Sequence, residues 1–143
     1  MKKALLLFSA LMALHMSAYS QVTFERIVGA ADEPQNWLTY SGRYSGWRYS
    51  TLDQINTSNA NLLTMQWAFQ TGGIGEFETT PIAVDGFLYG TGQNDRAFAI
   101  DARTGRAIWR YERTLPQQVR PCCGRVNRGF AMLGNKLFMA TLD

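Results

Sequence analysis

Apolar residues in the second half of the chain come in short runs that are separated by turn residues. Two runs joined by two to five residues rich in Gly, Asp or Asn predict a β-hairpin. The three such pairs are residues 81–84 with 87–89, 97–100 with 106–112, and 130–133 with 136–141. The apolar run 63–71 also predicts β structure. Short strands with closely spaced turns are typical of sandwiches, barrels and propellers, so the pattern predicts an all-β chain.

The segment before residue 63 has weaker signals. Asp32-Glu33-Pro34 predicts a short helix that runs towards Trp37, because proline is tolerated in the first helical turn. Side chains suited to helix capping, in Asn56-Thr57-Ser58-Asn59, precede residues 60–63, which predicts at most one helical turn there. We therefore expect residues 21–62 to be an N-terminal extension with short helical turns, and residues 63–143 to be the β part.

Residues 1–20 have the pattern of a secretory signal peptide. Lys2 and Lys3 precede a short apolar run, and Ala18-Tyr19-Ser20 supplies small residues for cleavage. We expect a secreted, periplasmic chain, in which disulfides persist. No apolar run approaches the ~20 residues that a transmembrane helix needs, so no membrane span is predicted.

Removing this segment changes what the charge implies. The formal net charge of the whole chain is +3, and it falls to about +1 once Lys2 and Lys3 are gone. No Lys/Arg block remains to indicate a nucleic-acid partner. His15 is the only histidine, so the mature chain has no Ser-His or Cys-His pair and no histidine metal ligand.

The spacing of Asp101, Gly105 and Trp109 has a structural rationale. Asp101 suits a residue whose side chain accepts backbone hydrogen bonds in a turn, and Gly105 suits a left-handed position. Trp109 then offers a large flat side chain for docking onto a neighbouring unit. An ordinary hairpin with a core tryptophan is the alternative.

Cys122 and Cys123 are adjacent in the sequence. Consecutive Cα atoms lie about 3.8 Å apart, below the roughly 4.4 Å lower limit of ordinary disulfides. A bond between these two cysteines would form a small strained ring that removes almost no chain entropy. A strained ring that adds little to stability is more plausible at a functional site than as a structural element. The open alternatives are that the two cysteines are free thiols, or that they are adjacent in the sequence by chance.

Further motifs are distributed over residues 37–143. They are Arg48-Tyr49-Ser50, Leu52–Asn56, Asn59, Leu62, Trp67–Phe69, Thr71-Gly72, Glu78–Pro81, Val84–Gly86, the segment Asp101–Trp109, Cys122–Gly124 and Val126–Gly129. In this combination the chain resembles the N-terminal part of the quinoprotein alcohol dehydrogenases, periplasmic enzymes that use pyrroloquinoline quinone (PQQ). The Cys-Cys pair followed by Val-Asn-Arg-Gly is the most specific part of the resemblance.

The resemblance implies an eight-bladed β-propeller, of which this chain would supply about two blades and the extension. It implies that Cys122 and Cys123 form a disulfide ring stacked on one face of the quinone, and that Glu78 and Arg128 contact its edge. Glu76, Arg120 and Arg125 are interpreted as solvated loop charges. A glutamate beside a cofactor carboxylate needs a shared proton or an intervening cation, and a guanidinium suits a planar tricarboxylate.

Other parts of the expected enzyme are not represented in this sequence. The apolar pattern at 137–143 stops without a closing element, so we expect a truncated chain that is inactive alone. The resemblance implies that the catalytic aspartate and the ligands of a calcium or lanthanide ion come from segments beyond Asp143. It also implies a small primary alcohol as substrate and a cytochrome c as electron acceptor. The alternatives are a non-catalytic propeller scaffold and a small secreted binding module.

Overall fold

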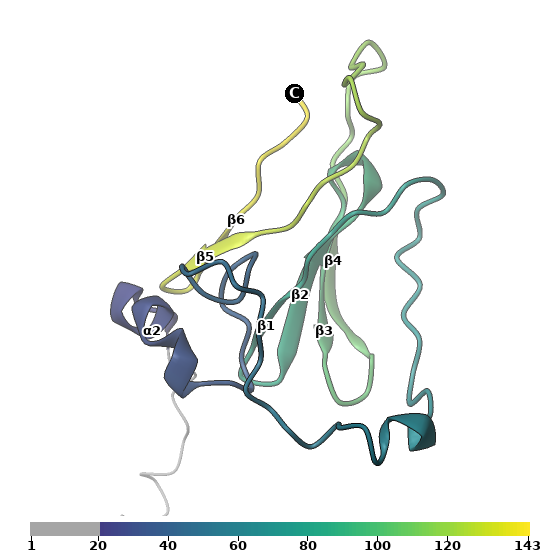
Figure 1. Ribbon diagram of the computed structural model, residues 1–143. Helices are drawn as coiled ribbons and strands as arrows, with labels where there is room; N and C mark the ends of the chain where they lie inside the picture. Colours follow the sequence, from purple (N-terminus) through teal and green to yellow (C-terminus); the bar gives the residue numbers. More distant parts are fainter. Residues whose placement is uncertain (1–20) are drawn as a thin grey trace, which may run out of the picture.

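The computed structural model describes residues 21–143 (Figure 1). Its elements are α2 (Phe24–Val28), η1 (Ala30–Asp32), η2 (Ala60–Leu62), β1 (Ile82–Val84), β2 (Phe87–Thr91), η3 (Gln93–Asp95), β3 (Ala97–Asp101), β4 (Ala107–Tyr111), β5 (Ala131–Leu133) and β6 (Lys136–Phe138). The predicted signal peptide lies outside the described residues. Between residues 21 and 143 no helix has the length and apolar character to cross a membrane.

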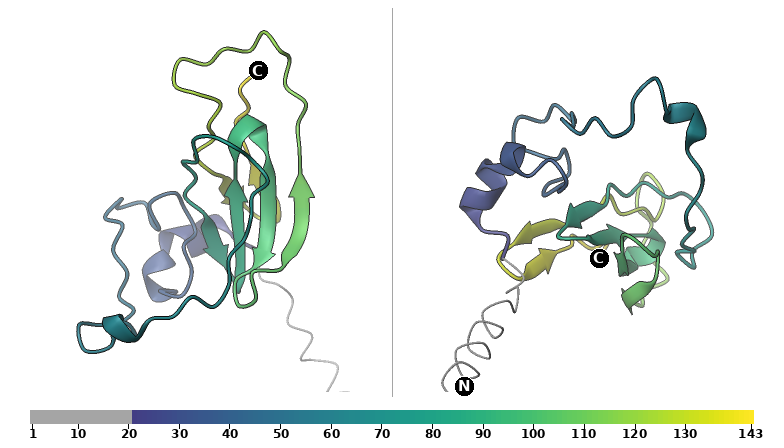
Figure 2. Two further views of the ribbon diagram at one scale, coloured as in Figure 1. Left: turned by 90° about the vertical axis from the view of Figure 1, so that its right-hand side faces the viewer. Right: turned by 90° about the horizontal axis from the view of Figure 1, so that it is seen from below.

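All three predicted hairpins are present. Strands β1 to β4 form one antiparallel sheet in sequence order, and β5 pairs with β6 in a second, two-stranded sheet. The β1–β2 turn places Asp85 at φ 50° and Gly86 at φ 84°, the left-handed pair that a two-residue hairpin turn requires. Figure 2 shows the four strands as one twisted layer, with the β5–β6 hairpin beside it.

The prediction of β structure for residues 63–71 is wrong in its detail, because no strand forms there. Side chains hold this segment instead of a backbone ladder. The Arg110 guanidinium donates to the Gln70 carbonyl at 2.9 Å and lies 4.4 Å from the centre of the Phe69 ring. The Phe69 ring packs against Phe98 of β3 at 4.9 Å. Phe69 therefore contacts the sheet through its side chain, whereas Leu63 and Met65 of the same run are exposed.

The predicted helix from Asp32 towards Trp37 is also wrong. The helix α2 begins earlier, where the Thr23 hydroxyl accepts a hydrogen bond from the Arg26 amide at 3.2 Å, and residues 34–35 form a turn. Glu33 precedes Pro34, and a residue before proline is disfavoured in helical conformation. The single turn predicted after Asn59 is present as η2, although the Asn59 side chain does not cap it.

The N-terminal segment contacts both sheets. Val22 forms an antiparallel bridge with Gly134 at the β5–β6 turn, and Trp37 forms one with Ala83 of β1. One cluster of buried side chains joins this segment to the sheet: Val22, Ile27, Ala30, Leu38 and Val84. A second cluster, made of Ile82, Ala97 and Phe130, lies between β1, β3 and the start of β5.

An ion-pair network fastens the extension to the β1–β2 turn. The Arg26 guanidinium donates to Glu33 at 2.8 Å and to Asp85 at 3.0 Å. Asn36 bridges the same groups, donating to Glu33 and accepting from the Asp85 amide. Hydrogen bonds from Arg26 hold the pKa values of Asp85 and Glu33 below their usual range.

Candidate functional site

The turn between β3 and β4 receives the docked ring of Trp67. The Asp101 carboxylate accepts from the amides of Arg103 and Thr104, both at 2.9 Å, and Gly105 lies at φ 70°. Hydrogen bonding from the Thr104 backbone lowers the pKa of Asp101. The Trp67 indole donates to the Ala102 carbonyl at 3.1 Å, and its ring lies so close to Gly105 that a Cβ there would be 2.6 Å from ring carbons.

Trp67 is thus the docked tryptophan within residues 21–143, and the sequence reasoning assigned this role to Trp109 alone. The signal was available, because Trp67 lies in an apolar run of the same kind as the one around Trp109. Both carry an indole N–H that needs a partner when the ring is buried.

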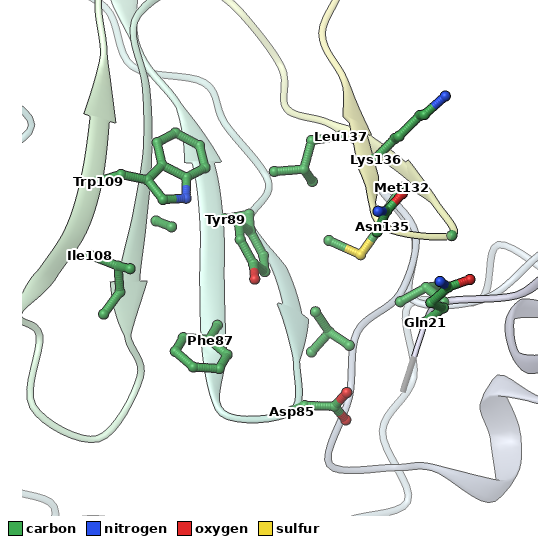
Figure 3. A pocket seen from close by; sticks show the side chains of 14 residues that line it. Gln21, Asp85, Phe87, Tyr89, Ile108, Trp109, Met132, Asn135, Lys136 and Leu137 are labelled. Atoms are coloured by element: carbon green, nitrogen blue, oxygen red, sulfur yellow. The ribbon is translucent and has the colours of Figure 1, made fainter. Parts of the chain in front are cut away.

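Trp109 borders an apolar groove of about 510 Å³ between the four-stranded sheet and the β5–β6 hairpin (Figure 3). Its ring lies 6.3 Å from that of Tyr89. Met132 and Leu137 of the hairpin line the opposite side. No docking of Trp109 onto a further repeat unit is seen among the described residues, so that role stays a prediction.

Two of the predicted cofactor residues meet directly. The Arg128 guanidinium lies 2.9 Å from the Glu78 carboxylate, and the two side chains are 63% and 39% exposed. Their chain segments are joined as well, since the Thr80 amide donates to the Arg128 carbonyl at 3.1 Å. Gly129 allows this approach, because a Cβ there would lie 2.8 Å from the Thr80 carbonyl oxygen. Arg128 is thus the cationic group paired with Glu78 in this structure.

The two cysteines lie in the electrostatic field of this pair. Cys122 and Cys123 are exposed and are present as thiols. The side-chain hydrogen bond with Cys122 is the main cause that raises the pKa of the Cys123 thiol, and the charges of Arg128 and Glu78 also act on it. All four predicted cofactor residues are exposed, and the two cysteines lie in the electrostatic field of the Arg128–Glu78 pair. We refer to these four residues as the exposed edge, and the disulfide between the cysteines stays a prediction.

Arg125 differs from its interpretation as a solvated loop charge. Its guanidinium donates to the Val119 carbonyl at 3.0 Å and contacts the Asn94 side chain at 3.4 Å. It therefore ties the loop that contains the cysteines to the turn after β2. Arg120 and Glu76 are exposed, as expected.

Tyr40 is a neighbour of the site that the sequence reasoning did not single out. The Arg48 guanidinium lies 4.6 Å from the centre of its ring. Hydrogen bonds from Arg48 and then Thr80 lower the pKa of the Tyr40 phenol, and the Arg128 charge acts in the same direction. Tyr40 of the N-terminal extension thus lies in the electrostatic field of Arg128.

In the described part of the chain no group of three or more His, Cys, Asp or Glu side chains could hold a metal ion. The four predicted cofactor residues form an exposed polar edge with one ion pair and two thiols.

A four-stranded antiparallel sheet in sequence order, with a tryptophan docked on its last turn and a further hairpin beside it, has the architecture of a β-propeller blade and the beginning of the next. The family model described as the glucose/ethanol/alcohol dehydrogenase β-propeller domain, the PQQ family, matches residues 37–139. The chain belongs to this family, and the prediction that it forms part of a propeller is confirmed.

Several characterised proteins are similar to the chain. It is 41% identical over 134 residues to the quinoprotein alcohol dehydrogenase PedH of Pseudomonas putida, covering 92% of this chain and 22% of that protein. It is 39% identical over 137 residues to the 1-butanol dehydrogenase (quinone) of Thauera butanivorans, covering 94% and 22%. The chain thus spans about a fifth of the length of these curated relatives.

Solved structures of quinoprotein dehydrogenases also superpose on the chain. The quinohemoprotein alcohol dehydrogenase ADHIIG of Pseudomonas putida HK5 superposes with a TM-score of 0.80 at 37% identity, covering 87% of this chain and 19% of that one. A europium-containing methanol dehydrogenase superposes with a TM-score of 0.75 at 31% identity, covering 82% and 21%.

Proposed function

We propose that this chain forms one side of the PQQ pocket of a periplasmic dehydrogenase that oxidises primary alcohols to aldehydes. The observation that carries the proposal is the ion pair between Arg128 and Glu78, in whose electrostatic field the exposed Cys122-Cys123 pair lies. Relatives of the chain named as alcohol and 1-butanol dehydrogenases support the substrate class.

The chemistry of the edge fits PQQ. The cofactor is a planar tricarboxylate, and the planar guanidinium of Arg128 can bind a carboxylate through two parallel hydrogen bonds. The Arg128 guanidinium is paired with Glu78, and 63% of the Arg128 side chain remains exposed for a ligand. The Arg128 charge in turn offsets the repulsion that a cofactor carboxylate would exert on Glu78.

In the proposed site each residue has a separate task. Arg128 binds and orients the cofactor edge, and Glu78 accepts hydrogen bonds there while it remains paired with Arg128. Cys122 and Cys123, once joined, cover one face of the quinone and exclude water from it. PQQ, when bound, supplies the electron-accepting carbonyl for alcohol oxidation, which a calcium or lanthanide ion polarises as a Lewis acid. The metal ligands and the catalytic base are proposed to come from other segments of the full-length protein, and a cytochrome c to accept the electrons.

The proposal is tested with the full-length gene product and Arg128→Lys. Lysine keeps the positive charge but loses the two parallel donors, so we expect PQQ to bind about tenfold more weakly. Equilibrium titration with PQQ in the presence of Ca²⁺ measures the affinity, and dye-linked ethanol oxidation measures activity. Arg120→Lys is the control, because Arg120 is exposed on the same loop. Equal affinity of the two variants, or no binding by the wild type, refutes the proposal.

A further inference from the structure

Three buried polar side chains are hydrogen-bonded around the residue that precedes Arg128: Thr91, Asp95 and Asn127. Thr91 and Asp95 are 0% exposed and Asn127 is 9% exposed. We refer to these three residues as the polar node. It connects the turn after β2 to the segment that carries Arg128. Asn127 lies in the Val126–Gly129 motif, but the sequence assigned no site role to any of the three.

Both oxygens of the Asp95 carboxyl group act as acceptors. Oδ1 accepts from the side-chain amide of Asn127 at 3.2 Å, and Oδ2 accepts from the backbone amide of Leu142 at 2.8 Å. Two donors directed at two oxygens require a carboxylate at this buried position, because the side chain of asparagine has only one oxygen. Asp95 thus joins the Arg128 segment to the chain that follows β6.

The amide nitrogen and oxygen of the Asn127 side chain, and its main-chain carbonyl, all form hydrogen bonds. Its Nδ2 also donates to the Ala140 carbonyl at 2.7 Å, and its Oδ1 accepts from the Gly129 amide at 3.1 Å. The Thr91 hydroxyl donates to the Asn127 main-chain carbonyl at 3.2 Å. The residues on both sides of Arg128 are therefore held, while the Arg128 side chain itself stays exposed to a ligand.

The turn that carries Asp95 is itself unusual. Asn94 and Asp95 lie at φ 57° and φ 53°, left-handed conformations that few residues other than glycine adopt. The Asn94 amide donates to the Arg125 carbonyl at 3.0 Å. Such conformations persist when surrounding contacts over-determine them, and they are concentrated at functional sites. The turn and the segment 125–129 thus form one hydrogen-bonded unit.

We propose that Asp95 is a positioning residue for cofactor binding, acting through Asn127 to hold Arg128 in the orientation that meets Glu78. The inference rests on the proposed function for its ligand, PQQ. If a segment adopts the binding orientation only part of the time, its apparent dissociation constant is the intrinsic constant divided by the fraction of time spent in that orientation. Loss of the polar node therefore weakens binding without touching any atom that contacts the cofactor.

The first experiment needs no cofactor. Asp95→Asn retains the shape and the left-handed preference, yet it places an NH₂ group against one of the two donors. Thr91→Val, of equal shape, removes the hydroxyl donor and serves as a second variant. The control is Asn36→Ala, which removes a buried polar group that is bonded to Glu33 and Asp85 instead of to this segment.

Hydrogen exchange of the full-length gene product, followed by mass spectrometry, reports on the segment. We expect Asp95→Asn to accelerate exchange about tenfold in the peptides that contain Gly129 and Leu142, whose amides depend on the polar node. Thr91→Val should accelerate exchange at Gly129, and Asn36→Ala should affect neither peptide. Unchanged exchange in Asp95→Asn overturns the inference.

The second experiment titrates the same variants with PQQ and Ca²⁺. We expect the dissociation constant to rise about tenfold for Asp95→Asn and to stay unchanged for Asn36→Ala. Faster exchange with unchanged affinity overturns the positioning role and leaves the proposed function intact. Failure of the wild type to bind PQQ refutes the proposed function and overturns the inference about the cofactor, and the exchange data still decide whether Asp95 orders the segment.

Discussion

The contact of Trp67 with Gly105 offers a sharp test of how the chain before β1 is attached to the sheet. A Cβ at position 105 would lie 2.6 Å from two ring carbons of Trp67, well inside van der Waals contact. Gly105→Ala therefore forces the ring to move. The moved ring also loses the hydrogen bond from its indole to the Ala102 carbonyl.

The expected cost has three parts. Alanine in a left-handed conformation costs about 1 kcal/mol, and the lost indole hydrogen bond costs about 1 kcal/mol. Loss of part of the ring's packing adds about 1 kcal/mol. Gly86→Ala is the matched control, because Gly86 has φ 84° and a Cβ there would meet no atom within 4 Å. We expect about 3 kcal/mol for Gly105→Ala and about 1 kcal/mol for Gly86→Ala.

The assay is urea unfolding of the full-length gene product, with the free energy of unfolding taken from each transition. A Trp67→Ala background supplies the double-mutant cycle, and in it Gly105→Ala should cost no more than Gly86→Ala. Equal costs for the two glycine variants in the wild-type background would show that the Trp67 ring does not depend on Gly105.

Three further predictions concern other parts of the molecule. We predict that Cys122 and Cys123 are joined after secretion, so unreduced protein should be lighter by about two hydrogens than the dithiol; two alkylatable thiols would contradict this. The pKa values of Asp85 and Glu33 are lowered by Arg26, so the stability that they contribute is present at neutral pH and is lost as the pH falls through about 4 and below. Arg26→Met should make the free energy of unfolding less dependent on pH between about 5 and 3, and an unchanged slope would refute the assignment. Residues 21–143 alone should show no dye-linked ethanol oxidation with PQQ and Ca²⁺ and should aggregate, because the groove beside Trp109 exposes apolar side chains; a soluble, active monomer would refute this.

The hairpins were predictable because local chemistry determines them. Asp85-Gly86 suits a left-handed turn, and the apolar runs on each side have strand length. The same local rules failed for residues 63–71 and for the helix near Pro34. At residues 63–71 contacts distant in sequence, with Arg110 and Phe98, decided the structure. Near Pro34 two local signals competed: the Thr23 cap starts the helix earlier, and the residue before proline is disfavoured in a helix.

Site prediction had a similar limit. Resemblance identified Glu78 and Arg128, and the structure places them in contact. Asp95 could not be found in this way, because its partners Asn127 and Leu142 are more than thirty residues away in sequence. A buried carboxylate has no local signature, and only the folded chain shows which donors reach it.

The bridge between Val22 and Gly134 has a consequence for the order of folding. The two residues exchange both backbone hydrogen bonds, at 3.0 and 2.8 Å, across roughly 110 residues of intervening chain. At synthesis rates of about 5–20 residues per second, Val22 waits on the order of ten seconds before Gly134 exists. The segment around Val22 is therefore synthesised early but docks late, and until then the side chains of Val22, Ile27 and Val84, which are buried together in the folded chain, are open to chaperones and to neighbouring chains.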